Sequence, residues 1–177
     1  INAQCTKVIE NGMSIMLCIG ETLGEYEQNL AGPICEMQLK KGLAGVSKED
    51  MSSVAIAYEP VWAIGTGKVA TPEIAQDVHE QIRETLKNMY GEDIADSTKI
   101  LYGGSVSPDS VDGLMAKPDI DGTLVGGASL SGESFGRIIN FQVSTEQVEN
   151  ATETEPTVIK KEGKIRRLKN KIKSAFK

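Results

Sequence analysis

The sequence predicts an α/β fold built on a parallel sheet. Short apolar, β-prone runs alternate along the chain with segments whose apolar residues recur at helical spacing, and glycines or polar residues separate them. About four such strand–helix units follow one another, without the glycine fingerprint of a Rossmann fold. With 177 residues, the chain can form one domain with a substantial core.

The first part of the chain predicts a helix, a strand, a second helix and a second strand. Residues 1–11 read as a helix end that Gly12 stops, and the apolar run 14–19 reads as a buried strand. Residues near 31–45 are expected to be helical, and 54–58 form the next strand. The inward candidates of these helices are Cys5, Val8, Ile9, Ile34, Met37 and Leu43.

The helix 72–90 has the clearest pattern in the chain. Thr71 can cap it, Pro72 suits its first turn, and Gly91 ends it. Its apolar residues repeat every four positions: Ile74, Val78, Ile82 and Leu86. The sole histidine, His79, lies one position past this stripe, which favours a structural role.

Two further strand–helix units complete the pattern. A strand is predicted over 99–102, followed by glycines and a short helix over 108–115. The last strand is predicted over 122–125, and the last amphipathic helix over 133–141. Three of its side chains can cover that strand: Phe135, Ile138 and Ile139.

Charge is distributed unevenly along the chain. Residues 1–157 carry a net charge of −14, and residues 158–177 carry +8. The acidic body argues against a nucleic-acid-binding core, and no run approaches the ~20 apolar residues of a membrane span. We expect reduced thiols in the cytoplasm, because the three cysteines lack metal-ligand spacing and no leader pattern is recognised in the sequence. Because the chain begins at Ile1 rather than Met, we expect it to be a fragment.

Residues 58–68, with the sequence YEPVWAIGTGK, are the most informative stretch of the chain. A strand ends in one carboxylate, Glu59, and the following residues resemble a lid that is stiff at its start and mobile at its tip. We define the lid as Pro60, Val61, Trp62, Ala63, Ile64, Gly65, Thr66, Gly67 and Lys68. A fixed base beside a closable lid suits proton abstraction in a water-excluded pocket. The alternative is a solvated glutamate at a strand end.

Small residues after successive strands form a second pattern. Gly65 lies at the lid tip, Ser105 follows two glycines after the third strand, and Gly126 and Gly127 follow the fourth. Exposed backbone N–H groups at such turns can bind an anion such as phosphate. The alternative is that these glycines only make tight turns.

Four collinear segments resemble the triosephosphate isomerase family: YEPVWAIGTGK at 58–68, CIGETL at 18–23, ILYGGSV at 100–106 and DGTLVGGASL at 121–130. The resemblance covers about residues 1–142 and implies the C-terminal half of a (β/α)8 TIM barrel. It also implies interconversion of dihydroxyacetone phosphate and glyceraldehyde 3-phosphate through an enediolate, with Glu59 as base. No metal or organic cofactor is implied, and the complete protein is expected to be a homodimer. The family's catalytic His and Lys and its substrate-binding Asn belong to the first half, so the isolated chain is expected to be inactive.

The resemblance also assigns residues that support the lid. Trp62, the only tryptophan, is expected near Glu21 and Tyr58 and to change partners as the lid moves, or simply to pack. Tyr102 and Ser105 resemble residues that latch the closed lid. Cys18 is expected to support Glu59 as a small core residue rather than to act as a nucleophile. The family usually has Arg where Tyr26 stands.

The last part of the chain is read separately. Residues 143–163 are polar and acidic and predict a disordered linker, whereas 164–177 are basic with an apolar face. This tail is either a short helix that makes weak contact with anionic surfaces or a solvated segment. The alternative function for the whole chain is a non-catalytic phosphate-binding half-barrel or interaction module.

Overall fold

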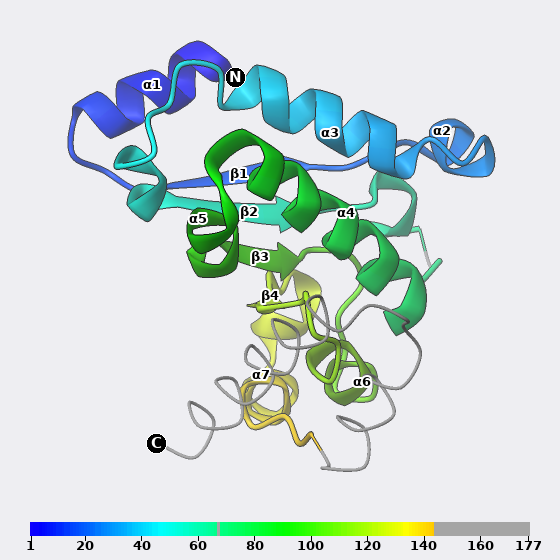
Figure 1. Ribbon diagram of the computed structural model, residues 1–177. Helices are drawn as coiled ribbons and strands as arrows, with labels where there is room; N and C mark the ends of the chain where they lie inside the picture. The colour runs from blue at the N-terminus through cyan, green and yellow to red at the C-terminus, as the bar shows by residue number, and fades with distance from the viewer. Residues whose placement is uncertain (67, 144–177) are drawn as a thin grey trace.

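The computed structural model describes residues 1–66 and 68–143, which form an α/β fold on a four-stranded parallel sheet (Figure 1). The strands are β1 (Ile15–Ile19), β2 (Val54–Tyr58), β3 (Lys99–Tyr102) and β4 (Gly122–Thr123). They lie in the order β1-β2-β3-β4, and each neighbouring pair is parallel. This arrangement confirms the predicted fold class. Gly67, the linker from 144 and the basic tail lie outside the described residues.

Helices connect the strands and cover one face of the sheet. They are α1 (Asn2–Glu10), α2 (Leu23–Glu27), α3 (Ala31–Gly42), α4 (Pro72–Tyr90), α5 (Glu92–Ser97), α6 (Val111–Met115) and α7 (Gly132–Ile139). Three short 3-10 turns accompany them: η1 (Asp50–Ser53), η2 (Val61–Ala63) and η3 (Gly127–Leu130). Figure 1 shows α1 and α3 along β1, α4 across β2 and β3, and α6 and α7 at the β4 end of the sheet.

The register of the sheet brings the carboxyl ends of the strands to one edge. Ile19 pairs with Tyr58, Tyr58 pairs with Tyr102, and Tyr102 pairs with Thr123. Side chains alternate between faces, so Leu17, Ile19, Ile100 and Tyr102 are buried while Met16 and Cys18 are exposed. The loops that follow the strands therefore leave the sheet side by side at that edge.

Helix α4 has the boundaries that the sequence predicts. The Thr71 hydroxyl accepts a hydrogen bond from the Ile74 N–H at 3.3 Å, Pro72 begins the helix, and Gly91 ends it with φ of +96°. Val78, Ile82 and Leu86 are buried as expected, and Ile74 is half-buried against the core.

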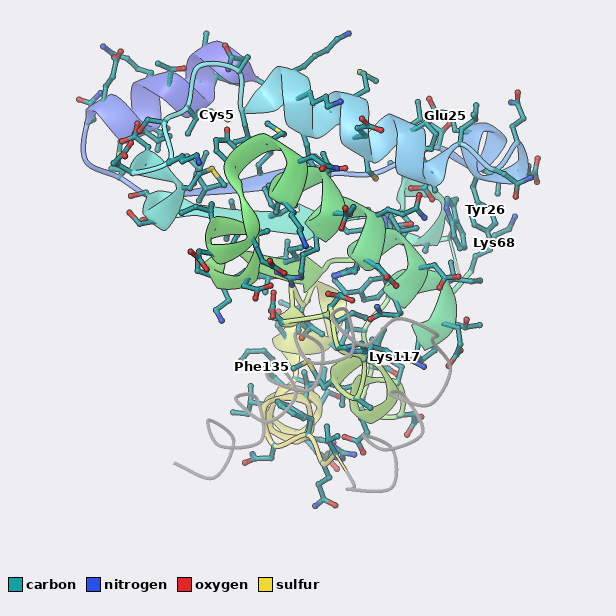
Figure 2. All side chains as sticks on the ribbon, in the orientation of Figure 1. Cys5, Glu25, Tyr26, Lys68, Lys117 and Phe135 are labelled. Carbon is teal, nitrogen blue, oxygen red and sulfur yellow. The ribbon has the colours of Figure 1, made fainter. Side chains whose placement is uncertain are left out.

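Other inward predictions need correction. Met37 is 39% exposed, and Cys35 and Leu39 are the buried side chains of α3. On α7, Ile138 is buried as expected, whereas Phe135 and Ile139 are exposed and line a groove together with Gly122 and Thr123 of β4 (Phe135 is labelled in Figure 2). β4 ends two residues before the predicted strand does, and the sequence reading missed α2 and α5. Both missed helices are too short for a periodic apolar pattern.

A buried ion-pair network fixes β4 against α4. Arg83, which is 4% exposed, bonds Asp119 Oδ1 at 3.0 Å and Asp121 Oδ2 at 2.6 Å. Its guanidinium also donates to the carbonyls of Ala95 and Thr98, and Asp121 Oδ2 accepts the Ile100 N–H. Removing one partner of such a network typically costs about 3–5 kcal/mol, because the other charge stays buried.

No helix within the described residues is long and apolar enough to cross a membrane.

Acid should destabilise this fold through His79. His79 is fully buried, and burial, helped by the Arg83 charge, lowers its pKa to about 4. The Asp119 carbonyl and the charges of Asp121 and Asp119 oppose this shift, while the rings of Tyr58 and Tyr102 face the imidazole. Because the pKa of His79 is lower in the folded state than in the unfolded state, the folded state favours the neutral imidazole. The stability it contributes is therefore complete above the unfolded pKa of about 6.5 and is lost as the pH falls toward 4.

We expect the free energy of unfolding, measured by urea titration, to fall over this window by on the order of 3 kcal/mol more in the wild type than in His79→Gln. The variant keeps the acidic groups that both proteins share, so only the histidine contribution is removed. Parallel pH profiles for the two proteins would contradict the assignment.

Candidate active site

Glu59 follows β2 directly and lies at the carboxyl edge of the sheet. Its backbone N–H donates to the Ile19 carbonyl at 2.7 Å, and the Gly103 N–H donates to the Tyr58 carbonyl at 2.8 Å. The parallel ladder therefore continues past the strand ends on both sides of Glu59. The backbone around Glu59 is therefore held by the ends of both neighbouring strands. This fixes the point from which its half-buried side chain extends.

Two glycines make room for Glu59. A Cβ at Gly103 would lie 2.6 Å from Glu59 Cγ, and a Cβ at Gly20 would lie 1.8 Å from the Glu59 carbonyl oxygen. Each glycine directly follows a strand that flanks β2. Any other residue at these positions would displace Glu59, so both glycines position the carboxylate.

Gln38 on α3 anchors the loop that contains Gly20. Its Oε1 accepts the Gly20 N–H at 2.8 Å, and its Nε2 donates to the Gly20 carbonyl at 2.9 Å. Sequence reasoning missed the roles of Gly20, Gly103 and Gln38. The glycines at matching strand ends were an available signal, but nothing in the sequence connects Gln38 to a backbone 18 residues away.

Cys18 lies beside Glu59. Burial raises the pKa of the Cys18 thiol, and the Glu59 charge and a hydrogen bond to Glu59 raise it further. The thiol is therefore protonated at neutral pH and is a poor nucleophile. This favours the supporting role expected for Cys18, but the residue is exposed rather than in the core as expected. A groove of about 480 Å³ opens here, lined in part by Leu17, Cys18, Gln38, Glu59 and Val61.

The first turn of the lid, η2, is held by Glu21. The Trp62 indole N–H donates to Glu21 Oε1 at 2.6 Å, and the Tyr58 hydroxyl donates to the same oxygen at 3.1 Å. The Val61 N–H donates to the Glu21 carbonyl at 3.0 Å. Glu21 is fully buried, and burial followed by the Glu21 charge raises the pKa of Tyr58. The expected neighbours Trp62, Glu21 and Tyr58 are thus in contact.

Tyr26 completes this cluster from α2. Its ring centroid lies 4.4 Å from that of Trp62, with an angle of 32° between the ring planes. Figure 2 shows Tyr26 on the same side of the molecule as the lid residue Lys68. The sequence reading noted Tyr26 only as a departure from the family and gave it no partner.

Residues after β3 meet the lid. The Ser105 hydroxyl donates to the Ala63 carbonyl at 2.7 Å. The Tyr102 hydroxyl is buried near the backbone of Ala70, and burial raises its pKa to about 12, with the Ala70 amide opposing the shift. Both residues expected to latch the lid therefore lie against it or just past its end.

The lid itself is held at its start and exposed at its tip. The Ala63 N–H donates to the Pro60 carbonyl at 2.8 Å, and the Thr66 hydroxyl donates to the Trp62 carbonyl at 2.6 Å. The Thr66 hydroxyl also accepts the Lys68 N–H at 3.2 Å. Trp62 and Ala63 are buried, whereas the exposed lid residues are Val61, Ile64, Gly65, Thr66 and Lys68. Gly67 lies outside the described residues.

The glycines expected to bind phosphate are open to solvent. Gly65 has φ of +66°, a conformation that favours glycine, and Gly126 and Gly127 are exposed. A Cβ added at Gly65, Gly126 or Gly127 would meet no atom within 4 Å. Ser105 contacts the lid through Ala63, and the register places the loop after β4 next to the loop after β3. These backbones are accessible to a ligand.

Within residues 1–66 and 68–143, no group of three or more His, Cys, Asp or Glu side chains could hold a metal ion. Glu59 lies at this edge, with the protonated Cys18 thiol beside it.

Comparison with known proteins identifies relatives of this chain. A sequence model of triosephosphate isomerase matches residues 1–142. The triosephosphate isomerase of Geobacter metallireducens is 49% identical over 142 residues, which are 80% of this chain and 57% of the relative. That of Carboxydothermus hydrogenoformans is 52% identical over 143 residues, covering 81% and 57%. That of Fusobacterium nucleatum is 50% identical over 139 residues, covering 78% and 55%. The chain thus spans somewhat more than half the length of these curated relatives.

Removing the Glu59 charge should activate the Cys18 thiol. Because that carboxylate helps to raise the pKa of Cys18, Glu59→Gln increases the thiolate fraction at pH 8. We expect iodoacetamide to alkylate Cys18 several-fold faster in Glu59→Gln than in the wild type, as measured by mass spectrometry of the Cys18 peptide. The buried Cys35 thiol is the internal control, and its alkylation rate should not change. Equal rates at Cys18 in both proteins would show that the two side chains do not interact.

Proposed function

The chain belongs to the triosephosphate isomerase family, and from this membership we propose that it supplies the base, the lid and the phosphate loops of an isomerase acting on triose phosphates. Because it spans 57% of the length of relatives such as the Geobacter protein, the activity, substrates and partners of the whole protein are part of this proposal. The observation that carries it is the position of Glu59, between two strand-end glycines and beside the lid.

In the proposed reaction, Glu59 moves a proton between adjacent carbons. Its carboxylate takes a proton from the carbon next to the carbonyl of dihydroxyacetone phosphate, leaving an enediolate. It returns a proton to the neighbouring carbon, which gives glyceraldehyde 3-phosphate. The oxygens must exchange a proton as well, and this needs a second donor. The sole histidine is buried between Tyr58, Tyr102 and Asp119, so it does not supply that donor.

The phosphate of the substrate is assigned to the exposed backbone of Gly65, Gly126 and Gly127 and to the loop at Ser105. Backbone N–H groups in such turns carry partial positive charge and can approach an anion closely where no side chain intervenes. Ser105 supports the assignment because it already ties the start of the lid to the loop after β3. A lid closed over the phosphate would exclude water from Glu59 and disfavour loss of the enediolate.

A second candidate is a phosphate-binding module without catalysis. The burial of His79 favours it, since an isolated chain then lacks a neutral electrophile beside Glu59. Under either proposal the domain division stays 1–142, 143–163 and 164–177, with the tail making at most weak contact with anionic surfaces. For the complete protein we propose a homodimer, as the resemblance implies. A cytoplasmic location is part of the same proposal, and the three free cysteines in the described residues support it.

Catalysis should depend on Glu59. We propose to fuse the part of the Geobacter metallireducens relative that this chain does not span to the N-terminus of the chain, and to measure isomerase turnover. The fusion should be active, and Glu59→Asp, which withdraws the carboxylate by about 1 Å, should lower kcat on the order of 100-fold. The unfused chain should show at least ~100-fold less activity than the fusion, because one missing oxyanion donor has that effect.

Glu27→Asp is the matched control, because Glu27 is an exposed carboxylate on α2 and its shortening should leave kcat unchanged. If Glu59→Ala kept turnover within threefold of the active fusion, Glu59 would not be the base. An active unfused chain would show that the second donor lies within the 177 residues.

The loop after β4 should bind the phosphate. Gly127→Val fills space that the fold leaves open, so it should weaken binding of a phosphate-bearing enediolate analogue to the fusion at least about tenfold without unfolding it. Gly136→Val is the control, since a Cβ there also meets no atom within 4 Å but lies on α7. Isothermal titration calorimetry gives the two affinities, and equal values would move the phosphate site elsewhere.

A further inference from the structure

We propose that Tyr26 is a positioning residue for the lid: its ring, stacked on Trp62, holds the first turn of the lid in the arrangement that joins it to Ser105. This inference rests on the proposed function, in which the lid and the Ser105 loop bind the phosphate of the substrate. Tyr26 itself would touch neither the substrate nor Glu59, and it acts through Trp62.

Trp62 is held on two sides. Glu21 Oε1 accepts the indole N–H at 2.6 Å and so fixes the edge of the ring. Tyr26 covers its face, with 4.4 Å between the ring centroids and a tilt of 32°. The hydrogen bond alone leaves the indole free to swing about the N–H direction. The stacked ring removes this freedom, so the orientation of Trp62 depends on both contacts.

The segment that carries both contacts is short and well braced. Glu21 and Tyr26 are five positions apart, on either side of the start of α2. Glu25 Oε2 accepts the Thr22 N–H at 2.7 Å and the Thr22 hydroxyl at 2.8 Å, which lowers the pKa of Glu25. The Tyr26 N–H in turn donates to the Thr22 carbonyl at 2.9 Å. This capping box fixes the Tyr26 backbone relative to Glu21.

The position of Trp62 affects the rest of the lid through two hydrogen bonds to backbone carbonyls. Its carbonyl accepts the Thr66 hydroxyl at 2.6 Å, and the carbonyl of the next residue, Ala63, accepts the Ser105 hydroxyl at 2.7 Å. A shift of the Trp62 backbone, which the pinned indole opposes, would move both carbonyls. A stacked aromatic pair shifts an equilibrium by about 2- to 10-fold, so loss of the Tyr26 ring should loosen the lid by that factor.

The test uses the 177-residue chain and three variants. Tyr26→Ala removes the ring, Tyr26→Phe keeps it without the hydroxyl, and Glu27→Ala changes an exposed neighbour on the same helix. Circular dichroism checks that each variant is folded, and Tyr26→Leu, which keeps apolar bulk without a ring, replaces Tyr26→Ala if that variant unfolds. Because Trp62 is the only tryptophan, its fluorescence reports directly on the stack.

Three readouts are compared: iodide quenching of Trp62, hydrogen exchange of the Ala63 and Ile64 amides, and the affinity for inorganic phosphate. In Tyr26→Ala we expect stronger quenching, hydrogen exchange faster by about 2- to 10-fold and phosphate binding weaker by a similar factor. Tyr26→Phe and Glu27→Ala should behave as the wild type does, because both keep the ring on Trp62.

The proposal is overturned if Tyr26→Ala increases quenching but leaves exchange at Ala63 and Ile64 unchanged, since the ring then only covers the indole. It is also overturned if Tyr26→Phe behaves as Tyr26→Ala does, because the hydroxyl rather than the stack would then matter. If phosphate does not bind the wild-type chain, the proposed phosphate site fails, and the hydrogen-exchange comparison still decides the role of Tyr26.

Discussion

The parallel register of the sheet decides which loops of this chain lie side by side. Ile19, Tyr58, Tyr102 and Thr123 are in line, so the segments that follow all four strands leave the sheet at the same edge. β4 has only two residues, and its place is secured by Arg83, which binds the carboxylates on either side of Ile120. A slip at any strand would separate the loops that the proposed function needs together.

At this edge of the sheet, a rigidly held residue, Glu59, is followed by a less rigidly held segment, the lid. The backbone of Glu59 is hydrogen-bonded to Ile19 on one side, and the preceding residue, Tyr58, is hydrogen-bonded to Gly103 on the other. The Glu59 side chain occupies space that is free because Gly103 has no side chain. The lid begins one residue later and is held mainly by side chains, those of Glu21, Tyr26 and Ser105. Backbone ladders resist motion more than single side-chain contacts do, so this arrangement is consistent with a proposed base, Glu59, that stays in place while the proposed lid moves.

Much of this arrangement could be predicted from the sequence, because local signals and the parallel topology agree. The caps and four-residue repeat of 72–90 predicted the boundaries of α4, and the apolar run 54–58 predicted the strand that Glu59 follows. The outward turn of Met37 could not be predicted, since Cys35 and Leu39 compete for the same face of α3. The contacts of Gln38 with Gly20 and of Tyr26 with Trp62 depend on how α3 and α2 pack, which no pattern in either helix specifies. α2 did carry one signal, the Thr22–Glu25 capping box.

The proposed function requires that one small ligand reach both the phosphate loops and the Glu59 carboxylate. The most direct measurement is covalent labelling of the 177-residue chain with a phosphorylated α-halo ketone, followed by mass spectrometry. The carboxylate displaces the halide to form an ester, whereas the neighbouring Cys18 thiol, held protonated, reacts slowly. We expect an ester on Glu59 whose formation is slowed by inorganic phosphate. Labelling spread over other carboxylates, or labelling at Glu59 that phosphate does not slow, would contradict it.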